Sequence, residues 1–341
     1  MPAALDERRA RAWSLKDECY AAWHSEPART TELASRLRSL AAEAAADIEL
    51  QSLAAWGYGI AALAVGDPLG ALTALEEAQR GFESLGDRQH AGETQIPQIV
   101  ALAMAGRDAE ATARGESALA SFEATGDHRN AAKVEGNLGT MLSRQDRHVE
   151  AERRWRRAGV RFARLGDREG SIAADVALAY CLAFQFRFDE AQRVNARARM
   201  RAQTHGFGIL HAQALQNSGR IELHRGRWHS ALPALAQAAK QMTELGAPPL
   251  RCLEAEMALA DAYLAVSLLD ESVRLYGGVI ALAARLGATV EQAWATLQHA
   301  RALERTGDSS LAVTGYEQSR ALYLSHENSA AVALCDLGLA R

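Results

Sequence analysis

The stretch Leu85-Gly86-Asp87-Arg88 returns 40 residues later as Thr125-Gly126-Asp127-His128 and, after 40 more, as Leu165-Gly166-Asp167-Arg168. Its glycine recurs beyond the third copy at the same spacing, with a last interval of 41 residues, at Gly206, Gly246 and Gly287. Glycine commonly ends a helix in the left-handed conformation, and a following aspartate can cap the next helix by accepting hydrogen bonds from its free N–H groups. We therefore interpret the stretch as a turn between two helices that recurs with a fixed period.

A second series of turns lies half a period away from the first. Its members are Gly66-Asp67, Gly106-Arg107-Asp108, Asp146-Arg147, Phe188-Asp189, Gly226-Arg227, Leu269-Asp270 and Gly307-Asp308. Between turns, apolar residues recur with a spacing near 3.6, and no segment alternates with period two. Each period thus holds two helices of about 15 to 18 residues, and the chain is predicted to be all-α.

Small residues at fixed positions indicate how these helices pack. One set stands early in each second helix, at Ala71, Ala111, Ala151, Ala191, Ala231, Ser272 and Ala312. Another set stands seven residues further on, at Ala78, Ala118, Ala158, Ala198 and Ala238. Such side chains let helix backbones approach closely, and larger neighbours are expected to fill the gaps beside them, namely Leu75, Trp155, Leu235, Tyr276 and Tyr316.

The period divides the chain into about eight helical hairpins. Residues 1–45 form an atypical first repeat, with helices expected over Asp6 to His24 and Ala28 to Leu40. Residues 46–327 form regular repeats, and residues 328–341 form one further helix within a single superhelix spanning 1–341. That last helix either caps the stack with Ala331, Leu334, Cys335 and Leu337, or marks where an array was cut from a longer chain.

These positions resemble the tetratricopeptide repeat (TPR). The resemblance rests on the small residues Gly59, Gly139, Gly219 and Ala260, on the turn glycine seven residues after them, and on the alanines five and twelve residues after that turn. The 40-residue period and the segment Asn137-Leu138-Gly139 are similar to the long-helix subclass of kinesin light chains and bacterial regulators. The resemblance implies a right-handed α-solenoid of about eight TPR-like hairpins plus a C-terminal capping helix.

The segment from Arg220 to Arg341 also resembles the repeat region that precedes the caspase-like CHAT peptidase in some bacterial proteins. The resemblance is carried by the turn Gly226-Arg227-Trp228-His229 and by the segments Ala260-Asp261-Ala262-Tyr263-Leu264 and Ala330-Ala331-Val332-Ala333-Leu334-Cys335-Asp336. The peptidase itself is missing from the sequence. This similarity implies the sensor part of a peptidase or regulatory system.

Composition and charge exclude several classes of function. The net charge of −4 lacks the positive excess that nucleic acid or anionic lipid demands. The longest apolar run, Leu53 to Val65, is shorter than the roughly 20 residues of a membrane span. The charged start, Met1 to Arg9, is unlike a secretory signal, and four scattered cysteines do not suggest disulfides. We expect a cytoplasmic protein without nucleic-acid or membrane partners.

No motif typical of catalysis, cofactor binding or metal binding has the structural context that it requires. Gly57-Tyr58-Gly59-Ile60-Ala61-Ala62 matches a dinucleotide fingerprint but falls inside a predicted helix, which favours close helix packing. His224 and His229 are five residues apart without a nearby carboxylate, so a metal site is not indicated. The arginine-rich segment Glu152 to Arg157 has acidic neighbours and is interpreted as a solvated helix face. The chain is predicted to be non-catalytic.

The candidate site is the concave groove that first helices line in TPR arrays. The candidate peptide-binding residues are Lys133, Asn137, Arg144, Tyr180, Asn217, Arg220, Glu254, Asp261, Trp294 and Arg301. The resemblance implies that Asn137 and Asn217 clasp a peptide backbone, because one amide can donate and accept together. A second hypothesis is an enzyme or small-molecule sensor with an enclosed pocket around Tyr180, His224, Asp261 and Trp294. A third is self-association through the terminal helix.

Overall fold

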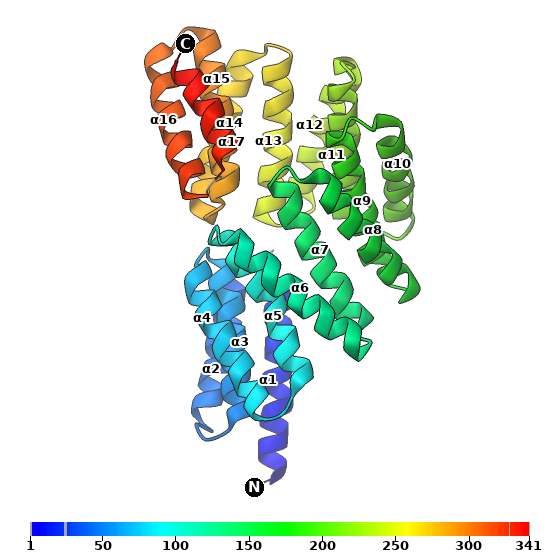
Figure 1. The fold of residues 1–341 in the computed structure, drawn as a ribbon, viewed down its shortest axis with the longest axis vertical. Helices are drawn as coiled ribbons and strands as arrows, with labels where there is room; N and C mark the ends of the chain where they lie inside the picture. The colour runs from blue at the N-terminus through cyan, green and yellow to red at the C-terminus, as the bar shows by residue number, and fades with distance from the viewer. Residues whose placement is uncertain (1, 24–25, 327, 341) are drawn as a thin grey trace. The chain divides into compact units, whose positions relative to one another are not determined.

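The computed structural model describes residues 2–23, 26–326 and 328–340, and the secondary structure in those ranges consists of seventeen α-helices (Figure 1). The helices group into two compact units, Met1–Asp167 and Arg168–Arg341. Unit 1 contains α1(Pro2–Ala22), α2(Pro27–Ala42), α3(Ile48–Ala64), α4(Pro68–Ser84), α5(Arg88–Met104), α6(Asp108–Thr125), α7(His128–Arg144) and α8(His148–Arg164).

Unit 2 repeats the same plan with one helix more. It contains α9(Arg168–Phe184), α10(Phe188–Thr204), α11(Gly208–His224), α12(Trp228–Glu244), α13(Pro249–Ala265), α14(Leu269–Leu286), α15(Thr289–Thr306), α16(Ser309–Ser325) and α17(Ser329–Leu339). The predicted all-α solenoid of eight hairpins and a terminal helix is confirmed. The predicted helix ends at His24 and Arg341 lie outside the described residues.

The turns have the conformations that the repeat predicts. All six glycines of the first series have φ between +60° and +75°, where only glycine is unstrained. The Asp87 carboxylate accepts from the N–H of His90, and Asp127 accepts from that of Asn130, as expected of helix caps.

The second series contains three left-handed residues that are not glycine. Gly66, Gly106, Gly226 and Gly307 have positive φ, and the equivalent turns of the other repeats place Asp146, Phe186 and Ser267 at φ of 59°, 60° and 65°. Aspartate tolerates this conformation, whereas a bulky residue in it is a backbone outlier. Phe186 is therefore the exceptional member of the series.

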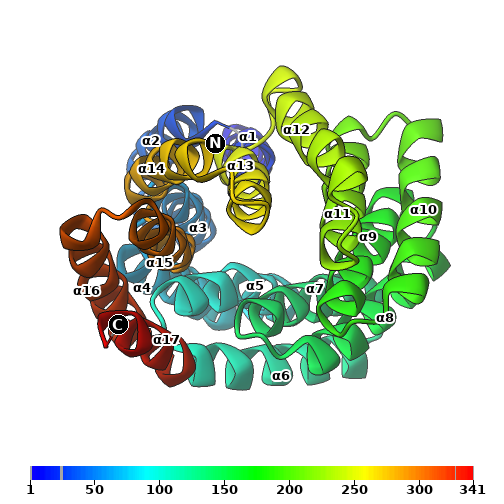
Figure 2. The same cartoon turned by 90° about the horizontal axis from the view of Figure 1, so that it is seen from above.

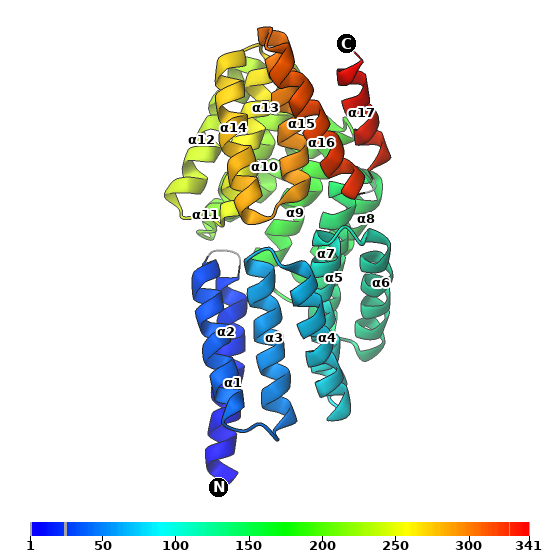
Figure 3. The same ribbon diagram turned by 90° about the vertical axis from the view of Figure 1, so that its left-hand side faces the viewer.

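Within each unit, the first helices of the hairpins form one layer and the second helices form another (Figure 2). Figure 3 shows this side-by-side packing for α1 to α4 of unit 1. The predicted packing residues are confirmed: Ala151 and Ala158 on α8, like their equivalents in the other repeats, are fully buried. An added Cβ at Gly219 would lie 2.6 Å from Cγ of Leu235, so glycine is needed for this helix contact.

The dinucleotide-like segment and the arginine-rich helix both make contacts that hold neighbouring helices together. Gly59 lies inside α3, where an added Cβ would be 2.6 Å from Leu75, so this glycine serves helix packing. On α8, Arg154 forms ion pairs with Glu116 of α6 and with the fully buried carboxylate of Glu135 on α7. The positive charge of α8 is thus partly taken up by neighbouring helices.

Helix α17 covers the end of unit 2 with part of its expected face. Ala331 and Cys335 are buried against α16, and Gly338 lies against the Tyr316 ring. Leu334 and Leu337, in contrast, are 38% and 60% exposed. The expectation that these two leucines also face the hairpin is wrong, because they flank the face formed by Ala331, Cys335 and Gly338 on its solvent-exposed side.

Candidate functional site

Equivalent positions on four successive first helices form what we call the first-helix stripe of unit 2. The stripe consists of Tyr180 on α9, Arg220 on α11, Asp261 on α13 and Arg301 on α15, at intervals of 40, 41 and 40 residues. The longer interval reflects one extra residue in the turn before α13. The repeat therefore gathers four of the predicted site residues into one row.

Arg220 is held by an aromatic ring and not by an acid. Its guanidinium carbon lies 5.4 Å from the centre of the Tyr180 ring, which is cation–π geometry. Its Nε is buried without a hydrogen-bond partner, and no carboxylate lies within ion-pair distance of Arg220 in the described part of the chain. The nearby half-buried arginines Arg201 and Arg225 both pair with aspartates. Arg220 thus keeps donors available for an acceptor from outside.

Asp261 connects three helices at the centre of the stripe. Its Oδ1 accepts from the Tyr276 hydroxyl of α14 at 2.5 Å and from the Trp294 indole Nε1 of α15 at 3.3 Å. Burial raises the pKa of the Asp261 carboxyl, although the charge of Arg220 acts in the opposite direction. Its Oδ2 makes no hydrogen bond with a described residue and can bond to a ligand. Trp294, whose position Asp261 fixes, remains 37% exposed.

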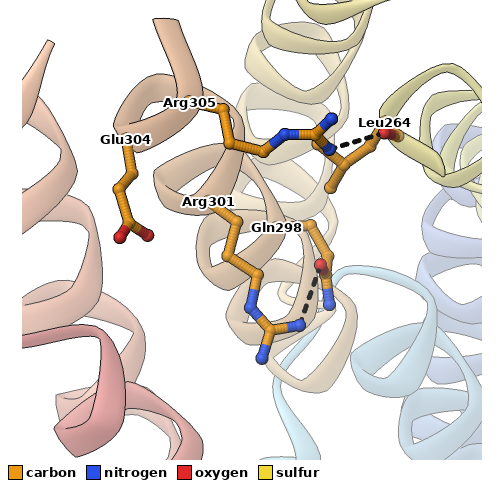
Figure 4. Close-up of a pocket in the computed structure, with 5 residues that line it drawn as sticks. All are labelled: Leu264, Gln298, Arg301, Glu304 and Arg305. Atoms are coloured by element: carbon orange, nitrogen blue, oxygen red, sulfur yellow. Dashed lines mark hydrogen bonds between the residues drawn. The ribbon is translucent and has the colours of Figure 1, made fainter. Parts of the chain in front are cut away.

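A pocket of about 480 Å³ continues the stripe along α15. Figure 4 shows Arg301 and Arg305 one helical turn apart on this helix, with Glu304 on its other side. Arg305 donates to the carbonyl of Leu264 at 2.8 Å. This carbonyl is one of the last in α13, which have no hydrogen-bond partner within the helix. Arg301 donates only to Oε1 of Gln298, at 3.3 Å, and has no carboxylate partner among the residues that the structure describes. The pocket is open, and its two arginines differ in that Arg305 is held by the Leu264 carbonyl and the Ser267 hydroxyl, whereas Arg301 is held only by Gln298.

The two candidate asparagines tie neighbouring first helices together. Asn217 Nδ2 donates to the carbonyl of Val176 at 2.9 Å, and Asn137 Nδ2 donates to that of Ile96 at 3.4 Å, each 41 residues earlier. Asn217 is only 6% exposed. The donor of each amide is therefore used inside the fold.

The remaining candidates occupy separate surroundings. Lys133 and Arg144 are exposed on α7 of unit 1. Glu254 on α13 forms an ion pair with Arg251 at 2.8 Å, so its charge is balanced. Among the candidate residues, the structure brings together those of the first-helix stripe and Trp294.

An aromatic ridge lies at one end of the stripe; its clustering and the part of Phe186 in it are not predicted from the sequence. We give this name to the rings of Phe184, Phe186, Phe188 and His224. The His224 ring lies 5.6 Å from Phe184, 6.4 Å from Phe186 and 6.2 Å from Phe188. Burial and the charge of Arg220 lower the pKa of His224. The available signal was the 40-residue spacing that puts Phe186 at a turn position held by glycine in other repeats.

The surroundings of the second hypothesis, an enclosed pocket, are not those of the pocket in unit 2. The pocket of unit 2 is lined by Leu264, Gln298, Arg301, Glu304 and Arg305, and so leaves out Tyr180, His224, Asp261 and Trp294. Within the described ranges, no three His, Cys, Asp or Glu side chains gather as a metal site. Over the same ranges, each helix is too short or too polar to cross a bilayer.

The fold is a TPR-like α-solenoid. The chain is similar to a Rap protein complexed with Competence and Sporulation Factor, with a TM-score of 0.60, 12% identity and 97% of each chain covered. It is similar to the Rap conjugation gene regulator of plasmid pLS20 in complex with the Phr* peptide, with a TM-score of 0.53, 12% identity and coverage of 97% of this chain and 96% of that one.

Yeast Tom70 is a further similar structure, with a TM-score of 0.56, 18% identity and coverage of 91% of this chain and 58% of that one. No protein-family model and no curated protein matches the sequence. At these identities the similarities establish the fold.

Proposed function

We propose that this chain is a non-catalytic TPR scaffold whose first-helix stripe in unit 2 binds an extended peptide segment of a partner protein. The observation that carries the proposal is the pair Arg220 and Arg301, two cations of one row that lack carboxylate partners. Leaving a buried donor unsatisfied costs about 1 to 3 kcal/mol, which an acceptor on a bound ligand would recover.

The spacing of the stripe favours an extended segment over a small molecule. Arg220 and Arg301 are separated by two helix spacings, or roughly 18 Å if neighbouring helices lie about 9 Å apart. An extended chain advances about 3.3 Å per residue, so about six residues would reach from one cation to the other. Between them, Oδ2 of Asp261 can bond to a peptide group, and the exposed face of Trp294 can cover an apolar side chain.

The remaining candidate residues fit this proposal in different ways. Asn217 is a positioning residue that keeps α11 against α9, and the carbonyl oxygen of its amide is left for a ligand. Lys133, Asn137 and Arg144 of unit 1 are proposed as a further contact region on α7. Glu254 and its partner Arg251 supply a charged edge to the site.

We place the scaffold in a regulatory system, as its sensor or adaptor in the cytoplasm. The similar Rap structures include a conjugation gene regulator in complex with a peptide, which supports this role. The resemblance of residues 220–341 to repeats beside CHAT peptidases points the same way. The alternative of an enzyme or small-molecule sensor would require an enclosed pocket around Tyr180 and His224, and the pocket observed in unit 2 lies elsewhere and is open.

The proposal can be tested by selecting ligands from a phage-displayed library of random dodecapeptides on the full chain. The Arg220→Met/Arg301→Met double variant removes both cations but keeps their aliphatic bulk. Arg199→Met is the matched control, because Arg199 is an exposed cation on α10. We expect peptides enriched on the wild-type protein and on Arg199→Met to be lost from the double variant. Equal enrichment on all three proteins, or no enrichment on any, would overturn the proposal.

A further inference from the structure

We infer that the aromatic ridge is an anchor site for an apolar side chain of the same peptide. The ligand is then a segment that combines an acidic group with an aromatic or large aliphatic residue. This inference rests on the proposed function and adds the chemistry of the ligand to it.

The first observation is the backbone of Phe186. Its φ is 60°, in the left-handed region, while the equivalent turns at Gly66, Gly106, Gly226 and Gly307 use glycine. A non-glycine residue in that conformation costs roughly 1 to 2 kcal/mol. Strain of this kind, kept where glycine would serve the fold better, is a recognised feature of binding sites.

The second observation is that the Phe186 ring contributes little to the core. The residue is 73% exposed, the highest value among the large exposed hydrophobic residues of the chain's described part. Its ring contacts Phe188 edge-on, with centroids 5.9 Å apart, and reaches His224 at 6.4 Å. A phenylalanine presented to solvent in this way suits contact with a partner.

The third observation is that the ridge is continuous with the stripe. The Tyr180 ring, over which Arg220 lies, is 4.6 Å from the Phe184 ring, and Phe184 in turn contacts His224. One ligand could therefore contact the rings and the guanidinium of Arg220 together. The two features are parts of one surface formed by α9, α11 and the turn after α9.

Charge around the ridge selects an acidic ligand. Three carboxylates nearby are already paired, namely Asp189 with Arg225, Glu190 with Arg187, and Glu222 with Arg227. The charge of Asp261 also acts on Arg220 and His224, but its Oδ1 accepts from Tyr276 and Trp294 and it forms no ion pair with Arg220. Arg220 is the cation of this surface that lacks such a partner. A carboxylate on the peptide would complement it, and an apolar residue close by in the sequence would then lie over the ridge.

The test uses Phe186→Gly, which removes the phenyl ring and relieves the strain of a left-handed backbone at this position. Glycine adopts this φ freely, so the melting temperature should stay the same or rise. We expect peptides selected on the wild-type protein to contain Phe, Trp, Leu or Met near an Asp or Glu. Such a synthetic peptide should bind Phe186→Gly at least tenfold more weakly, by calorimetry, and a peptide with that apolar residue changed to Ala should bind both proteins equally.

Asp146→Gly is the matched control, because it makes the same backbone change at the equivalent turn one repeat earlier. It should leave peptide affinity unchanged. Peptides that require Arg220 and Arg301 but show no apolar preference, or that bind Phe186→Gly as tightly as the wild-type protein, would overturn this inference and leave the proposed function standing. Peptides that bind the Arg220→Met/Arg301→Met variant as tightly as the wild-type protein would overturn the proposed function itself.

Discussion

The guanidinium of Arg220 lies 5.4 Å from the ring centre of Tyr180, a residue 40 positions earlier that holds the same place in the preceding repeat. The contact orients Arg220 without neutralising it, because an aromatic ring attracts a cation but carries no net charge. A carboxylate at position 180 would have used up the same guanidinium in an ion pair. The repeat thus presents a fixed cation that has no ion-pair partner within the described part of unit 2.

The glycine positions of the repeat predict a contrast between two single substitutions. Gly219→Ala should destabilise the protein by roughly 1 to 3 kcal/mol, because the new Cβ would lie 2.6 Å from Leu235 and 3.2 Å from the Ala231 carbonyl. Gly278→Ala, in an exposed part of α14 with nothing within 4 Å, should stabilise it by about 0.5 to 1 kcal/mol. Urea denaturation followed by circular dichroism would measure both. Similar effects at the two sites would contradict the packing described.

The buried ion pair of unit 1 predicts a strong dependence on one arginine. Arg154→Met should destabilise the protein by about 2 to 4 kcal/mol, because the fully buried Glu135 carboxylate loses its 3.1 Å partner and keeps only Arg157, at 3.7 Å. Arg153→Met, on the exposed side of α8, should change stability by less than about 0.5 kcal/mol. Adding Glu135→Gln to Arg154→Met should restore much of the loss in the same unfolding assay. A mild effect of Arg154→Met would mean that the ion pair between Arg154 and Glu135 does not stabilise the fold.

Asp47 predicts a dependence of stability on pH. Burial acts to raise the pKa of Asp47, but the N–H of Leu50 and the guanidinium of Arg9 outweigh burial, and the pKa lies below its usual value. The stabilisation is therefore complete above the unfolded pKa of about 3.9 and is lost as the pH falls through the lower folded pKa. The melting temperatures of wild type and Arg9→Met should differ at neutral pH and converge below about pH 4. A difference that grows in acid would refute this assignment.

Much of the fold could be predicted because each local signal recurs. The turn glycines, the capping aspartates and the buried alanines such as Ala151 recur at the same spacing. The interpretation of one repeat is therefore supported by the equivalent residues of the other repeats. No change in composition marks the boundary between the two units at Asp167. Boundaries of this kind depend on how well adjacent helices pack, which a regular repeat does not reveal.

The site was less predictable because it depends on the exact rotation of each helix. A template places Asn217 in the groove, yet its amide turns toward the Val176 carbonyl on α9. Phe186 could not be predicted from its residue type, because its left-handed backbone follows from its place in the repeat. The link between Tyr276 and Asp261 crosses from a second helix to a first helix, a contact that no single periodicity encodes.

The terminal helix predicts an effect of truncation. Deleting residues 328–341 should uncover the buried cluster that contains Tyr316 and Tyr323, and so cause dimerisation or aggregation with a lower melting temperature. Leu334→Glu/Leu337→Glu changes only the exposed side of α17 and should keep the melting temperature. Light scattering would compare the two proteins. A stable monomer after truncation would show that α17 is dispensable as a cap, and loss of a dimer on the leucine changes would support self-association through this helix.

The most direct test of the central claim is the affinity of one selected peptide for three proteins, measured by titration calorimetry. The dissociation constant should rise at least tenfold for Arg220→Met relative to the wild-type protein, since an acceptor on the peptide would lose its charged partner. It should change less than twofold for Arg199→Met. An affinity that Arg220→Met leaves intact while Arg199→Met weakens it would contradict the claim that the first-helix stripe of unit 2 is the peptide-binding surface.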